Sequence, residues 1–281
     1  MKVYSPSQVE SWFRCPTLWV LRQRGWRPKM MGKPDRAAIL GSGIHSGIFS
    51  YYGTKHLEIQ AMGTPEEVAK ATVDAEIKER QSLQGWLPGE EPTATPILAA
   101  KAVAKYIAKD PLPKGYVVHH IEATLPESGS CRIDWGVESS YGQPEVWDLK
   151  TKQTLDSRYL NKTLDQFRYS WQMYHYVHFY GQFLGRPVHQ FVIVLVVCDP
   201  FHIHVDPVPV DAELQHKWLN DAKSVWAIME KMEKGELEAW QAPDHYTTFG
   251  RCPYWDACIN SRLHEDLMEG NYVKIERKTS E

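Results

Sequence analysis

The sequence lacks the features that would place it in several large functional classes. No apolar run is long enough to cross a membrane, and the opening residues are polar and turn-forming, unlike a secretory signal. A Gly-x4-Gly-Lys-Ser/Thr phosphate-binding loop is also missing. We therefore expect a cytoplasmic protein without membrane association, in which any ATP-driven unwinding comes from a partner.

Cysteine is scarce, and its count is odd. Five cysteines in a chain without an export signal argue against a disulfide framework and leave free thiols or metal ligation. Basic residues do not predominate either, because the formal net charge is -3. This balance argues against a protein that coats nucleic acid by bulk electrostatics, but it permits an enzyme with a local basic groove.

The first part of the chain has the pattern of a helical layer. Apolar residues at mostly helical spacing predict helices, the first interrupted or bent at Pro16, over residues 8–24, 37–52, 65–82 and 97–107. The character changes near residue 116. Short β-prone runs, separated by Gly, Ser and Pro, then predict a three-stranded meander over residues 116–125, 131–137 and 145–150.

The rest of the chain alternates helix and strand. The pattern predicts a helix, a strand buried on both faces, a short neighbouring strand and a long helix over residues 164–184, 188–197, 202–205 and 210–234. This order favours an α/β fold with a mixed central sheet flanked by helices.

We expect one domain over residues 1–262. It comprises a helical N-terminal part (1–110), a catalytic sheet and helix (111–210), and a helix with a cysteine segment that packs with the N-terminus (211–262), before a charged tail over residues 263–281.

The meander carries the residues with the clearest chemistry. Asp134 and Asp148 each fall toward the end of a short predicted strand, and Asp148 and Lys150 share a face because side chains repeat every two residues. Two carboxylates can hold a hard divalent ion, while an ammonium orients the attacking water and stabilises negative charge. The alternative is a solvated strand edge, since Asp-x-Lys is a short pattern.

Two further motifs accompany this pair. The run from Val146 to Thr151, preceded by Gly129-x4-Asp134, resembles the second and third motifs of RecB-like PD-(D/E)XK nucleases. Gly41-x3-His45 and Gln172-x3-Tyr176 resemble two more motifs of that family, in the same order along the chain. Structural roles, a helix histidine and a core tyrosine, are the alternatives.

The resemblance implies a restriction-endonuclease-like core and a role for each residue. Asp134 and Asp148 would bind Mg²⁺ or Mn²⁺ with help from His45 and the backbone carbonyl of Leu149, and Lys150 would act on the water. In the family, the residues that correspond to Gln172 and Tyr176 support the active site and contact the DNA backbone.

The cysteine pattern resembles that of the iron–sulfur nucleases of this superfamily, the AddB type and the CRISPR-associated RecB-like exonucleases. Cys15 near the start would join Cys252 and Cys258 around a 4Fe-4S cluster. The sequence departs from the pattern because Phe249 stands where a further cysteine is expected. His245 is a candidate fourth ligand; zinc or a metal-free relic are alternatives.

Cys131 and Cys198 lie in apolar runs and are expected to be small buried residues, although either could ligate if the fold brought it near. Eleven tryptophans and fourteen tyrosines could supply stacking surfaces for unpaired bases. Phosphate contacts could come from Arg158, Lys162 and Arg168.

Together the motifs predict a metal-dependent DNA nuclease, an exonuclease on single strands or DNA ends. The resemblance suggests recombination, repair, phage DNA processing or CRISPR adaptation, with a helicase, a recombinase or a CRISPR adaptation protein as partner. A noncatalytic DNA-binding or scaffold subunit that retains the nuclease fold is the alternative, and an enzyme acting on RNA is a third possibility.

Overall fold

The computed structural model describes residues 1–28, 36–84, 94–168 and 170–240, with short strands at 246–247, 250–251 and 272–274. The predicted boundary between residues 262 and 263 lies outside the described residues. Within these ranges, no helix is both long and apolar enough to span a membrane.

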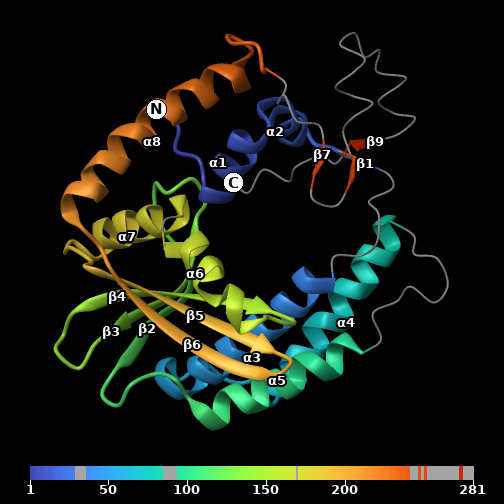
Figure 1. Ribbon diagram of the computed structural model, residues 1–281, viewed down its shortest axis with the longest axis vertical. Coiled ribbons are helices and arrows are strands. Elements are labelled where there is room, and N and C mark those ends of the chain that lie inside the picture. The colour runs from blue at the N-terminus through green and yellow to red at the C-terminus, as the bar shows by residue number, and fades with distance from the viewer. Residues whose placement is uncertain are drawn as a thin grey trace.

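A five-stranded mixed sheet lies between layers of helices (Figure 1). In spatial order its strands are β2 (Val117–Thr124), β3 (Arg132–Glu138), β4 (Pro144–Lys152), β5 (Gln190–Cys198) and β6 (Phe201–Pro209). The antiparallel pairing of β2, β3 and β4 confirms the predicted meander, and β5 joins β4 in parallel. The chain between these two parallel strands is helical, as a parallel connection usually is.

Helices cover both faces of the sheet, which confirms the predicted α/β architecture. One face packs against α3 (Arg36–Leu57), α4 (Pro65–Gln84) and α5 (Thr95–Lys109). The other packs against α1 (Pro6–Arg14), α2 (Pro16–Gln23), α6 (Leu160–Arg168), α7 (Trp171–Leu184) and α8 (Ala212–Lys234). Seen in Figure 1, α3 and α5 lie below the strands and α7 above them. Residues of β5 alternate between the two cores, so this strand is buried on both faces as predicted.

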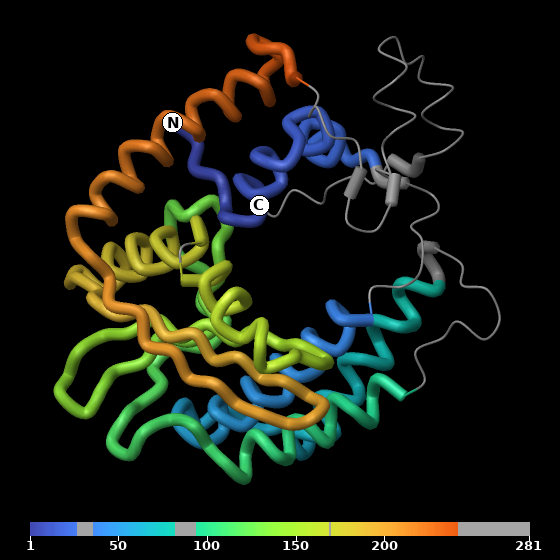
Figure 2. Tube along the Cα trace, in the orientation of Figure 1, coloured from blue at the N-terminus to red at the C-terminus, as the bar shows by residue number. Residues whose placement is uncertain are grey.

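The N-terminus packs against the far end of α8. Lys2 pairs with Glu233 at 2.7 Å, and the Trp12 indole N–H approaches the Met232 sulfur at 3.2 Å. Figure 2 shows the first residues running beside α8 before α1 begins. A short strand, β1 (Trp26–Pro28), pairs with β9 (Tyr272–Lys274), so residues from the two ends of the chain meet there.

Two segments predicted as helical are each divided into two helices. The predicted interruption at Pro16 is confirmed, because α1 ends at Arg14 and α2 begins at Pro16. The single helix predicted over residues 164–184 is wrong, since α6 and α7 are separate. The Ser170 hydroxyl accepts a hydrogen bond from the Met173 N–H and so caps the start of α7.

Close packing of α3 against its neighbours generates a stability prediction. A Cβ at Gly47 would lie 2.7 Å from the Pro65 carbonyl oxygen and 2.8 Å from a Val103 methyl. Gly47→Ala should therefore lower the free energy of unfolding by about 1–3 kcal/mol, although alanine is the better helix former. Urea unfolding measures this effect.

Gly53→Ala in the same helix is the matched control. Its Cβ would meet Ile59 only at 3.4 Å, an ordinary contact, so helix propensity should raise stability by about 1 kcal/mol or less. Equal effects of the two substitutions would show that close helix packing does not set the requirement for glycine.

Candidate active site

The site begins where two neighbouring strands separate. β3 and β4 pair from Glu138 opposite Pro144 to Trp135 opposite Trp147, and the ladder between them ends there. One step further, the Leu149 N–H donates to the Asp134 carboxylate at 2.8 Å instead of to a backbone carbonyl. The Asp134 side chain thus takes the place of a backbone acceptor between β3 and β4, and its Oδ1 atom is left for other partners.

The side chains of β3 also switch from one face of the sheet to the other at this point. Ile133 packs with the core on the α7 side, whereas Trp135 packs with the core on the α3 side, although residues two apart normally share a face. Their partner strand is irregular too, because Glu122 of β2 has a φ of 48°. Asp134 therefore lies at a seam that side chains from both faces can reach.

Asp148 and Lys150 lie side by side on β4, as their spacing predicts. The Lys150 ammonium is 2.7 Å from Asp148 Oδ2 and donates to the Gln172 amide oxygen at 2.9 Å. The Gln172 amide nitrogen donates to the Tyr176 hydroxyl at 2.6 Å and approaches Asp148 Oδ1 at 3.4 Å. Gln172 thus contacts both members of the pair, and Tyr176, one turn further along α7, contacts Gln172.

His45 approaches from the opposite face of the sheet. Its Nδ1 is 3.9 Å from the Asp134 carboxylate, and α3 runs so close to β4 that a Cβ at Gly41 would lie 2.9 Å from the Thr151 hydroxyl. Burial, reinforced by the charge of Lys150, lowers the pKa of His45 to about 4. The imidazole is thus neutral at pH 7, the form that ligates a metal.

Burial of the two carboxyl groups disfavours their charged forms. The side chains of Asp134 and Asp148 are only 18% and 1% exposed, and burial raises the pKa of each to about 6 against the attraction of Lys150. Burial alone would lower the pKa of Lys150, but the two carboxylates raise it above its ordinary value. One ammonium thus faces two carboxylates.

This donor set fits a hard divalent cation. Asp148 Oδ2 accepts no well-aligned hydrogen bond although it lies beside Lys150, and a cation would supply the positive charge that the second carboxylate lacks. Within residues 1–28, 36–84, 94–168 and 170–240, no group of three or more His, Cys, Asp or Glu side chains is placed to hold a metal ion, so His45, Asp134 and Asp148 do not form a complete ligand set by themselves. The site offers oxygens and room for water, which suits Mg²⁺.

The predicted cysteine centre can be followed only in part. Cys15 is buried at the junction of α1 and α2, where its sulfur accepts the Leu18 N–H at 3.5 Å. Cys252, Cys258 and His245 lie outside the described residues.

Cys131 and Cys198 are buried in the two different cores, and burial raises their thiol pKa values to about 12 and 11. Both cysteines are therefore small buried residues, as expected.

The site is also lined by residues that no sequence motif singled out. One pocket of about 530 Å³ contains His45 and Asp134, with Glu122 and Arg132 on its wall. A second, of about 170 Å³, lies between α1 and α7 and includes Glu10 and Arg132. Arg132 precedes Asp134 by two residues, and strand periodicity could have drawn attention to it.

Two of the cations considered for phosphate contact are already paired. Arg168 binds both oxygens of Asp206 at 2.6 Å each and also contacts Asp165, and Arg158 is paired with Asp156. These guanidiniums therefore have carboxylate partners within the protein.

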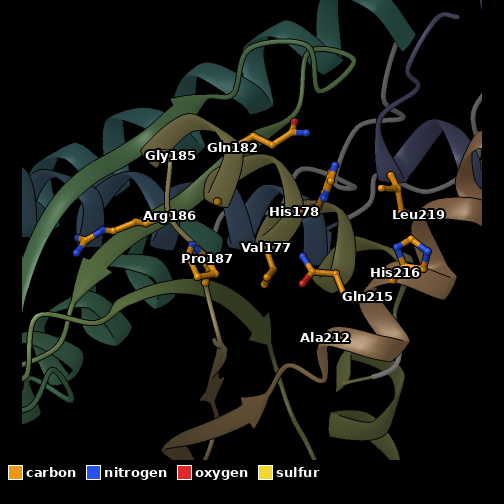
Figure 3. A pocket seen from close by; sticks show the side chains of 12 residues that line it. Val177, His178, Gln182, Gly185, Arg186, Pro187, Ala212, Gln215, His216 and Leu219 are labelled. Carbon is orange, nitrogen blue, oxygen red and sulfur yellow. The ribbon is translucent and has the colours of Figure 1, made fainter.

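A separate hollow lies between α7 and α8 (Figure 3). It measures about 510 Å³ and contains none of the predicted site residues. Figure 3 shows side chains from the two helices on either side of it, among them His178, Gln182, Gln215 and His216. The chemistry described above is thus concentrated at the end of β4 and not in this hollow.

The fold and this cluster define a nuclease-like α/β enzyme core, and comparison with known proteins agrees. The family model of the PD-(D/E)XK nuclease superfamily matches residues 3–259. The chain therefore belongs to the PD-(D/E)XK nuclease superfamily.

Individual relatives are distant. A crystal structure from Eubacterium rectale, whose exonuclease designation is provisional, has a TM-score of 0.49 and 14% identity, covering 94% of this chain and 89% of its own. The structure of SSO0001 has a TM-score of 0.25 and 12% identity, covering 75% of this chain and 86% of its own. No curated protein matches the sequence.

The burial of Asp134 generates a pH-dependent prediction. Its folded-state pKa of about 6 exceeds the ordinary value near 4, so its stability contribution is present below pH ~4 and is lost as pH rises through about 6. In metal-free protein, Asp134→Asn should raise stability by up to about 3 kcal/mol at pH 8, because the amide carries no charge. This advantage should shrink steadily between pH 6 and pH 4.

Thermal unfolding in EDTA from pH 4 to 8 measures the difference. Added Mg²⁺ at pH 8 should stabilise the wild type more than the variant, since binding to the folded state shifts the equilibrium. A difference that does not vary with pH would mean that ionisation of Asp134 is not its cause.

Proposed function

We propose that this protein is a Mg²⁺- or Mn²⁺-dependent deoxyribonuclease that hydrolyses phosphodiester bonds. The observation that carries the proposal is the clustering of Asp134, Asp148 and Lys150 at the split between β3 and β4. These groups come from two strands and are buried, which a solvated strand edge would not require. Membership of a nuclease superfamily supports the same reaction class.

Each residue has a role that follows from its position. Asp134 and Asp148, with the Leu149 carbonyl and neutral His45, would hold the cation. When bound, that ion would acidify a water and neutralise charge on the substrate phosphate. Lys150 orients the attacking water and stabilises developing negative charge through its ammonium protons.

Gln172 and Tyr176 act as positioning residues. Gln172 accepts a hydrogen bond from Lys150 and donates toward Asp148, so it fixes the ammonium relative to the carboxylate. Tyr176 accepts the other amide proton and limits rotation of the Gln172 side chain. Burial raises the pKa of Tyr176, which keeps its hydroxyl protonated.

Aromatic rings beside the site support action on unpaired strands. Phe13 of α1 is 56% exposed, and its ring centroid lies 5.4 Å from that of Trp171, the residue before Gln172. The Phe167 ring lies 5.4 Å from the Lys150 ammonium. Exposed rings next to a phosphate-cleaving site suit stacking with unpaired bases. We therefore propose an exonuclease on single strands or DNA ends.

The biological setting proposed here rests on the resemblance of the motifs. It is a cytoplasmic role in recombination, repair, phage DNA processing or CRISPR adaptation, with a helicase, a recombinase or a CRISPR adaptation protein as partner. Noncatalytic DNA binding is the competing proposal. The intact set of Asp134, Asp148 and Lys150 favours catalysis over noncatalytic binding, because an inactive site does not require these three charged groups.

The central test is cleavage of end-labelled single- and double-stranded DNA, and of a matched RNA, with Mg²⁺, Mn²⁺ or EDTA. Asp148→Ala and Lys150→Ala should each lower the rate by about 100-fold or more, because each removes a group that acts at the reacting phosphate. Asp221→Ala and Lys223→Ala are the matched controls, since both side chains are exposed on α8. Circular dichroism verifies folding of all four variants.

Wild-type protein that binds DNA yet cleaves no substrate would favour the scaffold, and cleavage of RNA alone would change the substrate class. Full activity of the folded Asp148→Ala variant would show that the reaction occurs elsewhere.

We further propose that Cys15 contributes to an iron–sulfur or zinc centre with Cys252 and Cys258, with His245 as the candidate fourth ligand. Elemental analysis of the purified protein should find stoichiometric metal: iron with inorganic sulfide and visible absorbance for a cluster, or zinc without colour. Cys15→Ser should lose this metal, and Cys198→Ser, altering a buried thiol in the other core, should retain it. Wild-type protein without iron or zinc would rule the centre out.

A further inference from the structure

Arg132 occupies an unusual place between the two halves of the site. It lines the pocket that contains His45 and Asp134 and also the pocket that contains Gln172 and Tyr176. It is the first residue of β3, directly before the seam at which that strand parts from β4. One guanidinium thus borders both the proposed metal side and the proposed water-activating side.

No other arginine or lysine lines either pocket within the described residues. The ammonium of Lys150 is already held by Asp148 and Gln172. A strand that crosses both pockets would therefore meet Arg132 as its available cation.

The present partner of Arg132 is replaceable. The guanidinium lies 3.3 Å from the Glu122 carboxylate, and the two side chains are 59% and 44% exposed. Exposed ion pairs of this kind contribute little to stability because water screens them. A phosphate offers the same planar group two oxygens and a charge-assisted bidentate contact.

We propose that Arg132 binds a backbone phosphate of the substrate strand beside the scissile one, and that Glu122 holds the guanidinium until the strand replaces it. This inference rests on the proposed nuclease function and names a subsite of the same site. Glu122 acts as a stand-in anion at the wall of the metal pocket, and binding of the strand frees it.

The first test measures binding of a labelled single-stranded oligodeoxynucleotide by fluorescence anisotropy in EDTA over a range of salt concentrations. Arg132→Gln should weaken binding by about 10-fold and reduce the slope of log Kd against log salt by about 0.7, the value for one phosphate contact to a single strand. Arg132→Lys should restore the slope and only part of the affinity, since lysine keeps the charge but not the bidentate fork. A purely structural role would leave the slope unchanged.

Glu122→Gln supplies the converse variant. It should tighten binding about 2- to 5-fold, because removing the competing carboxylate frees Arg132 for the phosphate. Weaker binding by this variant, with unchanged unfolding temperature, would contradict the exchange of partners.

The second test locates the phosphate. Oligodeoxynucleotides in which one phosphate at a time is replaced by a neutral methylphosphonate are compared on wild type and Arg132→Gln. One position should weaken wild-type binding and have no further effect on the variant. Equal losses in both proteins at every position would overturn the proposal.

The two proposals can fail separately. Wild-type protein that cleaves no DNA would refute the nuclease function, while the binding measurements would still decide the role of Arg132. Normal cleavage with an unchanged salt slope in Arg132→Gln would refute the subsite and leave the nuclease intact.

Discussion

Two carboxylates share one buried ammonium at the end of β4, and the arrangement of the site depends on this imbalance of charge. Asp148 is buried, Asp134 is largely buried at the wall of a pocket, and burial raises both pKa values to about 6. Lys150 offsets only one unit of the negative charge. The imbalance costs stability in the metal-free protein, and in the proposed function a divalent cation would offset it.

Tight packing around the site keeps the two carboxylates and the ammonium close together. The sheet has apolar cores on both faces, and their close packing holds β4 and β5 in place. Both layers contribute to the split at Asp134. α3 brings His45 from one face and α7 brings Gln172 from the other, and the Leu149 N–H ties the strands together through a side chain.

The N-terminal layer has a second role beyond packing. α1 places Glu10 in the pocket that contains Gln172 and the exposed ring of Phe13 against Trp171. The start of β3 places Arg132 at both pockets. The end of α8 holds this layer through contacts with Lys2 and Trp12. The groups proposed to bind the strand thus surround the groups proposed to cut it, and they come from parts of the chain far apart in sequence.

The sequence by itself determined the alternation of helices and strands, the meander, and the identity of the central residues, because side-chain periodicity puts Asp148 and Lys150 on one face and a one-turn spacing aligns Gln172 with Tyr176. It misjudged the helix over 164–184, where the local cap at Ser170 outweighs apolar spacing. Only the tertiary structure decided that Asp134 replaces a rung of the ladder, that His45 reaches it from the opposite face, and that Arg132 borders both pockets. These features depend on strand splitting and on contacts between distant segments, which no local pattern encodes.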